Sequence, residues 1–119
     1  MKVLDKIRQD ARLVDEIDWD MTPEEAVRLY LEWGNNWSRG NYVIRSKDDE
    51  AVYFVVSTWK DPPMVYLIRR NSEEAREIAA LTMPKAIEKQ FIKENGNLKG
   101  VYAIEGVVKD WLKRELAQA

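Results

Sequence analysis

The sequence predicts a single α+β domain over residues 1–119, in which a three- or four-stranded antiparallel meander packs with about five helices. Three observations predict this class. Apolar residues recur at helical spacing towards both ends of the chain, while β-branched and aromatic residues run together in the middle. The middle segments are joined by short connections, which favour antiparallel neighbours. No repeat or linker divides the chain, and the resulting order α-α-β-β-β-α-α-(β)-α is typical of an α+β fold.

Two helices are predicted before the sheet. Residues 3–17 place apolar side chains at helical spacing with charged residues between them, which indicates an amphipathic helix lying on a core. Thr22 precedes Pro23, and Glu25 follows three residues after Thr22. A capping threonine, a proline at the first helical position and a glutamate at this spacing are typical of a helix start. The second helix is expected to run from Pro23 through Trp33 and to be buried more deeply than the first.

Three strands are predicted in the middle of the chain, at residues 42–45, 51–59 and 64–69. The second is rich in β-branched and aromatic residues on both of its faces, which favours a central strand covered on both sides. A polar turn at 47–50 and the prolines at 62–63 separate the three segments. The short connections predict a meander in which the start of the first strand lies beside the end of the second.

The C-terminal part is predicted to be mainly helical. Ser72 and the acidic residues after it open a helix, with Ala75, Ile78 and Ala79 as its apolar stripe, that Met83-Pro84 interrupts. A further helix is expected at 84–94. Residues 100–104 are ambiguous between a short edge strand and an extended link. The last helix begins near Glu105 or Gly106, and its apolar positions are Val108, Trp111, Leu112 and Leu116.

The composition excludes several kinds of chemistry. The chain has no Cys and no His, so it has no disulfide, no thiolate nucleophile, no Cys- or His-ligated metal and no Ser-His-Asp triad. Its five glycines are scattered, so no glycine-rich phosphate loop occurs. The net charge of −2 is too small to steer the protein onto nucleic acid. No run of about 18 apolar residues and no signal-peptide pattern occurs. We therefore expect a cytoplasmic protein without membrane association.

Two clusters of acidic residues are candidate sites for a hard cation. Asp18 and Asp20 lie close to Glu24 and Glu25, and a second acidic group spans 48–50. Calcium and magnesium take such oxygen ligands, but the spacing is not that of a calcium-binding loop. The first cluster is better explained by a helix start and the second by a solvated turn. The sequence therefore predicts no metal site, no cofactor and no catalytic residue.

An aromatic and basic group is the candidate functional surface. In the predicted meander Trp37, Arg39, Tyr42 and Trp59 share one edge of the sheet. Trp and Arg are enriched in interface hot spots, and aromatic residues also stack on single-stranded bases. The alternative is structural, because a loop tryptophan often covers a core with an arginine stacked on it.

One block of the sequence resembles a small bacterial protein family with no assigned activity. The resemblance covers roughly residues 18–70, and its segments are DW at 18–19, MTPE at 21–24, YLEWG at 30–34, WSRG at 37–40, YFVV at 53–56 and TW at 58–59. It implies a bacterial, cytoplasmic origin and assigns no functional residue.

Three hypotheses for the function follow. The first is a noncatalytic module that binds a protein partner or a second copy of itself through the aromatic and basic edge. The second is a small-molecule binder or an enzyme that uses Asp, Glu, Lys or Tyr, which requires a concave site. The third, ranked last, is binding of single-stranded nucleic acid. A nucleic-acid partner is the one that the charge balance favours least.

Overall fold

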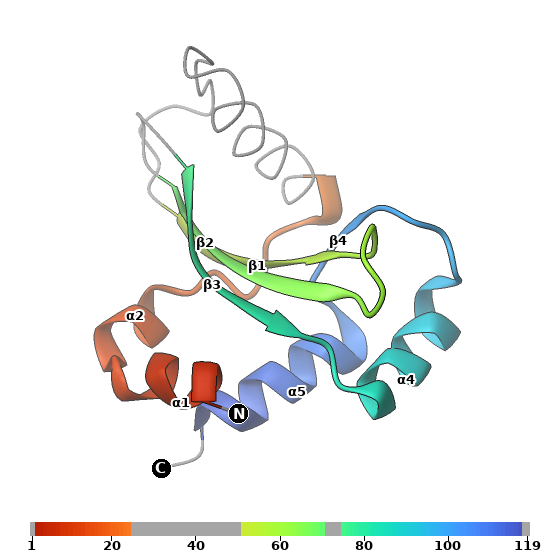
Figure 1. Ribbon diagram of the computed structural model, residues 1–119. Coiled ribbons are helices and arrows are strands. Elements are labelled where there is room, and N and C mark those ends of the chain that lie inside the picture. The colour runs from red at the N-terminus through yellow and green to blue at the C-terminus, as the bar shows by residue number, and fades with distance from the viewer. Residues whose placement is uncertain (1, 25–50, 71–74, 118–119) are drawn as a thin grey trace.

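The computed structural model of the chain describes residues 2–24, 51–70 and 75–117 (Figure 1). These residues form an α+β fold, as predicted. Its helices are α1 (Lys2–Gln9), α2 (Ala11–Glu16), α4 (Lys85–Asn95) and α5 (Gly106–Ala117), and its strands are β1 (Ala51–Ser57), β2 (Met64–Arg70), β3 (Ala75–Thr82) and β4 (Val101–Ala103). The strands make one antiparallel sheet in the order β3-β2-β1-β4.

The helix predicted over residues 3–17 is in fact two helices that meet at Asp10. Asp10 has non-helical backbone angles (φ −98°, ψ 85°), and its carboxylate accepts the backbone N–H of Leu13 at 3.1 Å. Aspartate is a strong N-cap, so it ends α1 and starts α2 at one residue. The predicted apolar face is nevertheless retained, because Leu4, Ile7 and Leu13 are all buried.

The prediction of a central strand is confirmed by β1, which ends at Ser57, two residues before the predicted end at Trp59. It pairs with β2 along its whole length, and residues 55–57 pair with β4 on its other side. Its side chains are buried on both faces of the sheet, and Tyr53, Phe54 and Val55 are at most 1% exposed. The strand at 64–69 is also confirmed, as β2.

The helix predicted to open at Ser72 is wrong over its described part. Ala75–Thr82 form β3, which pairs with β2 from Arg70 back to Met64. The alanines, Arg76 and Glu77 in this segment are good helix formers, but propensity is a weak preference that pairing along a full strand overrides. Residues 72–74, where the helix was expected to start, lie outside the described residues.

The C-terminal elements follow the prediction closely. The helix expected at 84–94 is α4, which ends at Gly96 in the left-handed region (φ 81°) where glycine is favoured. The ambiguous segment at 100–104 contains a strand, β4. The last helix is α5, and all four of its predicted apolar positions are buried.

The described helices pack on one face of the sheet (Figure 1). The main core lies between that face and the helices, and it joins Phe54 and Leu67 of the sheet to Trp111 and Leu112 of α5. The opposite face is also buried, around Tyr53, Val55, Tyr66 and Ile68, with Met21 packed among them. No helix among the described residues is long and apolar enough to cross a membrane.

Only the first two residues of the second predicted helix belong to the described residues. Pro23 and Glu24 are helical, in agreement with the expected beginning at Pro23. The remainder of that helix, the turns at 35–41 and 47–50, and the strand predicted at 42–45 lie outside the described residues.

Candidate functional site

Trp59 is the member of the predicted surface that the structure describes. It follows β1 in the loop 58–63, and 66% of its surface is exposed. Most of the indole is therefore open to solvent. Trp37, Arg39 and Tyr42 lie outside the described residues.

The end of β1 that leads to Trp59 is flanked by two described strands. Ser57 pairs with Met64 of β2 on one side and with Val101 of β4 on the other. We predicted that the strand at 42–45 would begin beside this end, whereas in the described residues β4 and the loop before it lie there. The loop carrying Trp59 therefore lies next to the loop at 96–100.

Thr58 holds these two loops together. Its backbone N–H donates to the carbonyl oxygen of Gly100 at 2.9 Å, and its hydroxyl oxygen accepts the N–H of Gly100 at 2.7 Å. The hydroxyl also lies 3.1 Å from the Gly100 carbonyl oxygen and 3.3 Å from that of Leu98, to which it can donate its one proton. Thr58 is itself only 6% exposed. Because the polar atoms of a buried threonine are satisfied here, the two loops are fixed relative to each other.

Leu98 is the second exposed apolar residue on these loops, at 77% exposure. Its carbonyl oxygen accepts the hydroxyl of Tyr102 at 2.6 Å. The ring of Tyr102 packs edge-on against Phe91 in the core, with 5.3 Å between ring centroids. The backbone of Leu98 is thus anchored while its side chain faces solvent.

A lysine follows each of these apolar residues. Lys60 and Lys99 are exposed, and neither makes a hydrogen bond or ion pair with the described residues. Asp61, which is also exposed, is the acidic neighbour. We define the Trp59–Leu98 surface as Trp59, Lys60, Leu98 and Lys99. It groups two exposed apolar side chains and two cations that lie on the two loops joined by the hydrogen bonds of Thr58 to Gly100.

The acidic residues weighed as cation ligands have other roles in the described part of the chain. The Asp18 carboxylate accepts the N–H of Asp20 at 2.9 Å, and Asp20 pairs with Lys109 at 3.2 Å. Among residues 2–24, 51–70 and 75–117, no group of three or more carboxylates is placed to hold a metal ion. The acidic group at 48–50 lies outside the described residues.

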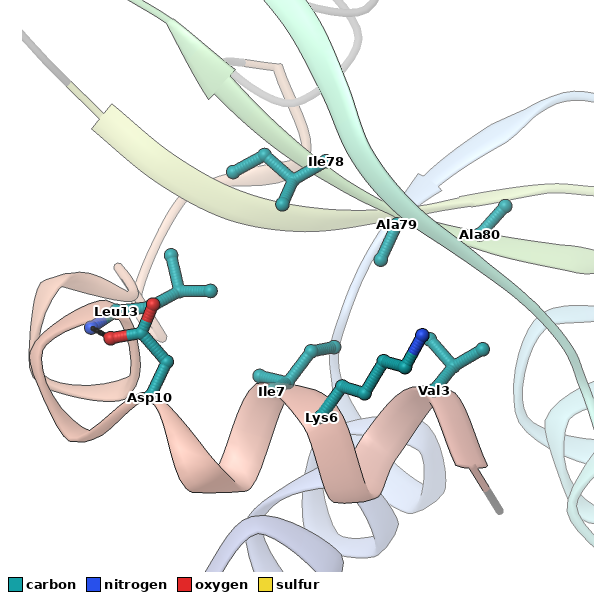
Figure 2. Close-up of a pocket in the computed structure, with 8 residues that line it drawn as sticks. All are labelled: Val3, Lys6, Ile7, Asp10, Leu13, Ile78, Ala79 and Ala80. Atoms are coloured by element: carbon teal, nitrogen blue, oxygen red, sulfur yellow. Dashed lines mark hydrogen bonds between the residues drawn. The ribbon is translucent and has the colours of Figure 1, made fainter.

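A groove between α1 and β3 is a feature that the sequence reasoning missed. It has a volume of about 310 Å³, and apolar side chains of α1, α2 and β3 line it together with Lys6 and Asp10 (Figure 2). With residues 75–82 interpreted as a helix, no strand edge was expected beside α1. Ala79 and Leu81 pack in the main core whereas Ala80 packs on the opposite face of the sheet, which is the alternation of a strand.

Comparison with protein-family models, with curated proteins and with solved structures finds no match for this chain. A function can therefore be inferred only from the geometry of the chain's own residues.

Proposed function

We propose that this chain is a noncatalytic interaction module that binds a protein partner through the Trp59–Leu98 surface. The observation that carries the proposal is an exposed tryptophan, 66% accessible, on a loop that Thr58 fixes to a second loop bearing an exposed leucine. Tryptophan is among the residues most enriched in interface hot spots. Folding buries only about a third of the Trp59 surface, so the rest of the indole is free for contact with a partner.

The hydrogen bonds around Thr58 favour binding because they order the surface in advance. Association loses affinity when loops and side chains must be ordered at the moment of contact. Here Thr58, which precedes Trp59, is hydrogen-bonded to Gly100, and the carbonyl oxygen of Leu98 accepts the Tyr102 hydroxyl. These bonds reduce the ordering that a partner must impose on the two loops.

The charges around the surface indicate the chemistry of the partner. Lys60 and Lys99 directly follow the two apolar residues in the sequence, and neither has an ion-pair partner in the described residues. We infer a partner with an apolar pocket for the indole and acidic groups at its rim, since complementary charges steer association and exclude wrong partners. A second copy of the chain and a single-stranded nucleic acid, whose bases could stack on Trp59, are the alternative occupants. We also propose that the protein is of bacterial origin and meets this partner in the cytoplasm.

Site-specific photocrosslinking tests the proposal. A photoreactive phenylalanine analogue replaces Trp59 in one sample and Leu98 in a second, and replaces Arg12, an exposed residue of α2, in the control. We expect one protein to be crosslinked from positions 59 and 98 but not from position 12. Crosslinking of nucleic acid or of a second copy would assign the surface to that occupant instead. Equal labelling from all three positions would contradict a specific surface.

The identified partner then allows a quantitative test. With purified components, Trp59→Ala should weaken binding at least about tenfold, as is typical of a central aromatic hot spot. Arg114→Ala, which removes an exposed side chain from α5, serves as the matched control and should leave the Kd unchanged. A Trp59→Ala protein that binds as tightly as the parent would refute the proposal.

A further inference from the structure

Within the described residues, the outer edge of β3 is an unpaired strand edge. β3 is the first strand in the sheet order, and no described segment pairs with its outer side. Arg76, Glu77 and Thr82 are exposed, and Ile78 is 38% exposed. Unpaired backbone N–H and C=O groups on such an edge are a template for pairing with another chain.

A β-bulge limits the part of this edge that can pair regularly. Leu67 is opposite Ala79 and Ile68 is opposite Glu77, so Ile78 is the extra residue on β3. A bulge bends and twists its strand and breaks the ladder locally. Residues 79–82, on the C-terminal side of the bulge, are therefore the part of the edge that can pair regularly with an added strand. This part lies beside the groove, whereas the charged Arg76 and Glu77 lie on the other side of the bulge.

The groove lies on the helix side of this regular stretch. Figure 2 shows the methyl group of Ala79 pointing towards α1, while Ile7 points from α1 towards the strand. A small side chain at Ala79 leaves space that a larger residue would fill, and Val3 and Leu13 complete the apolar lining. This hollow suits one aliphatic side chain of an added strand.

Lys6 gives the groove an unpaired positive charge. Its side chain lies along the groove with the ammonium on the side that faces β3 (Figure 2). Within the described residues the Lys6 ammonium makes no hydrogen bond or ion pair. Asp10, the other charged residue of the lining, accepts the backbone N–H of Leu13 as the cap of α2. An occupant with a carboxylate would therefore complement the groove.

We propose that the groove binds an extended peptide segment of a partner, which adds as a strand beside residues 79–82. One aliphatic side chain of the peptide enters the hollow at Ala79, and one carboxylate pairs with Lys6. In this mode main-chain hydrogen bonds supply affinity, and pockets for alternate side chains supply specificity. The inference does not rest on the Trp59–Leu98 surface, and either can fail without the other.

The edge favours a peptide over a small carboxylic acid. About 310 Å³ is at the lower limit for a small-molecule site. An exposed ion pair with Lys6 contributes little by itself. Strand addition supplies several further hydrogen bonds along the edge, which a small acid cannot make.

Nuclear magnetic resonance titration of the full ¹⁵N-labelled chain tests the proposal with four probes. The first is an acetylated octapeptide of alternating threonine and leucine with one glutamate, and the second has glutamine in place of that glutamate. The third is the glutamate peptide methylated on alternate backbone nitrogens, which cannot pair as a strand. The fourth is hexanoate. We expect the glutamate peptide to shift amide signals at 79–82 and in α1, and backbone methylation to weaken binding about tenfold or more.

Variants make the assignment specific. Lys6→Gln should weaken the glutamate peptide about two- to fivefold and leave the glutamine peptide unchanged, as expected for an exposed ion pair. Ala79→Leu should abolish binding by filling the hollow. Lys85→Gln, which neutralises an exposed lysine of α4, and Trp59→Ala should leave binding unchanged.

Three results would overturn the proposal. They are the absence of saturable shifts with either unmodified octapeptide, equal binding of the methylated peptide, and hexanoate shifting the same signals while the peptides do not. If Ala79→Leu perturbs the fold, the methylated peptide and Lys6→Gln still decide the outcome.

Discussion

Replacing Thr58 with valine should loosen the connection between the two loops of the Trp59–Leu98 surface. Valine keeps the β-branched shape of threonine but removes the hydroxyl. The backbone hydrogen bond from Thr58 to Gly100 remains. The Gly100 N–H loses its acceptor at 2.7 Å, and the carbonyl oxygens of Leu98 and Gly100 lose a donor.

The expected loss of stability follows from these contacts. A hydrogen bond of this kind contributes about 0.5–1.5 kcal/mol net, and Thr58→Val removes two of them. Thr58 is buried, but Gly100 is only half-buried, so water can replace part of what is lost. We therefore expect the free energy of unfolding to fall by about 1–2 kcal/mol. The corresponding fall in Tm is about 3–8 °C for a chain of this size.

Urea denaturation followed by circular dichroism measures this change. Thr58→Ser keeps the hydroxyl and is the matched control, for which we expect less than half the effect of valine. An unfolding free energy for Thr58→Val within about 0.3 kcal/mol of the parent would refute the idea that the hydroxyl holds the loops together. The same result would remove the argument that the surface is ordered before binding.

Three further predictions concern the fold that carries both sites. Trp111→Ala should lower the free energy of unfolding by about 3–5 kcal/mol, because the indole is 6% exposed in the main core; a loss under 1 kcal/mol in urea denaturation would contradict that packing. Gly96→Ala should lower it by about 1 kcal/mol because of the positive φ at the end of α4, and an unchanged Tm would count against the left-handed cap. Glu94→Ala should lower it by about 0.5–2 kcal/mol, because the carboxylate accepts the Val107 N–H at 3.1 Å at the start of α5; Glu88→Ala on the same helix is the control, and equal effects would exclude the cap.

The sequence predicts most of the described elements because their local signals agree with their tertiary environment. The β-branched and aromatic residues at 51–57 both favour a strand and fill a sheet that is buried on two faces. The apolar residues around Trp111 recur at helical spacing, and they lie on the face of α5 that packs in the core. Asp10 was interpreted as one more charged residue of a helix, although an aspartate between two apolar stretches is also a strong cap.

The failure at β3 has a specific physical cause. The segment contains alanine, arginine and glutamate, which are good helix formers, and its identity as a strand depends on β2 rather than on its own propensity. The bulge at Ile78 also inserts one residue into the strand. It interrupts the two-residue alternation of inward and outward side chains, which is the sequence pattern that would have indicated a strand. The groove was missed for the same reason.

Only part of the candidate surface could be predicted from the sequence. Trp59 was identified from its position at the end of a strand, but its exposure depends on how the loop at 96–100 packs beside it. Leu98 was not singled out, although a lone leucine among Gly96, Asn97, Lys99 and Gly100 is the kind of apolar residue that a turn leaves in solvent. The contact between the two loops is a tertiary feature that no local pattern encodes.

The affinity of the crosslinked partner for Trp59→Ala, relative to Arg114→Ala, tests the central claim most directly. A tryptophan presents roughly 150–250 Å² for burial, and burying two thirds of the upper value at about 25 cal/mol per Å² is worth at most about 4 kcal/mol. We predict a loss of at least about 1.4 kcal/mol for Trp59→Ala, which is a tenfold rise in Kd, and no change for Arg114→Ala. Equal Kd values for the two variants would contradict a protein that works through contact at this surface.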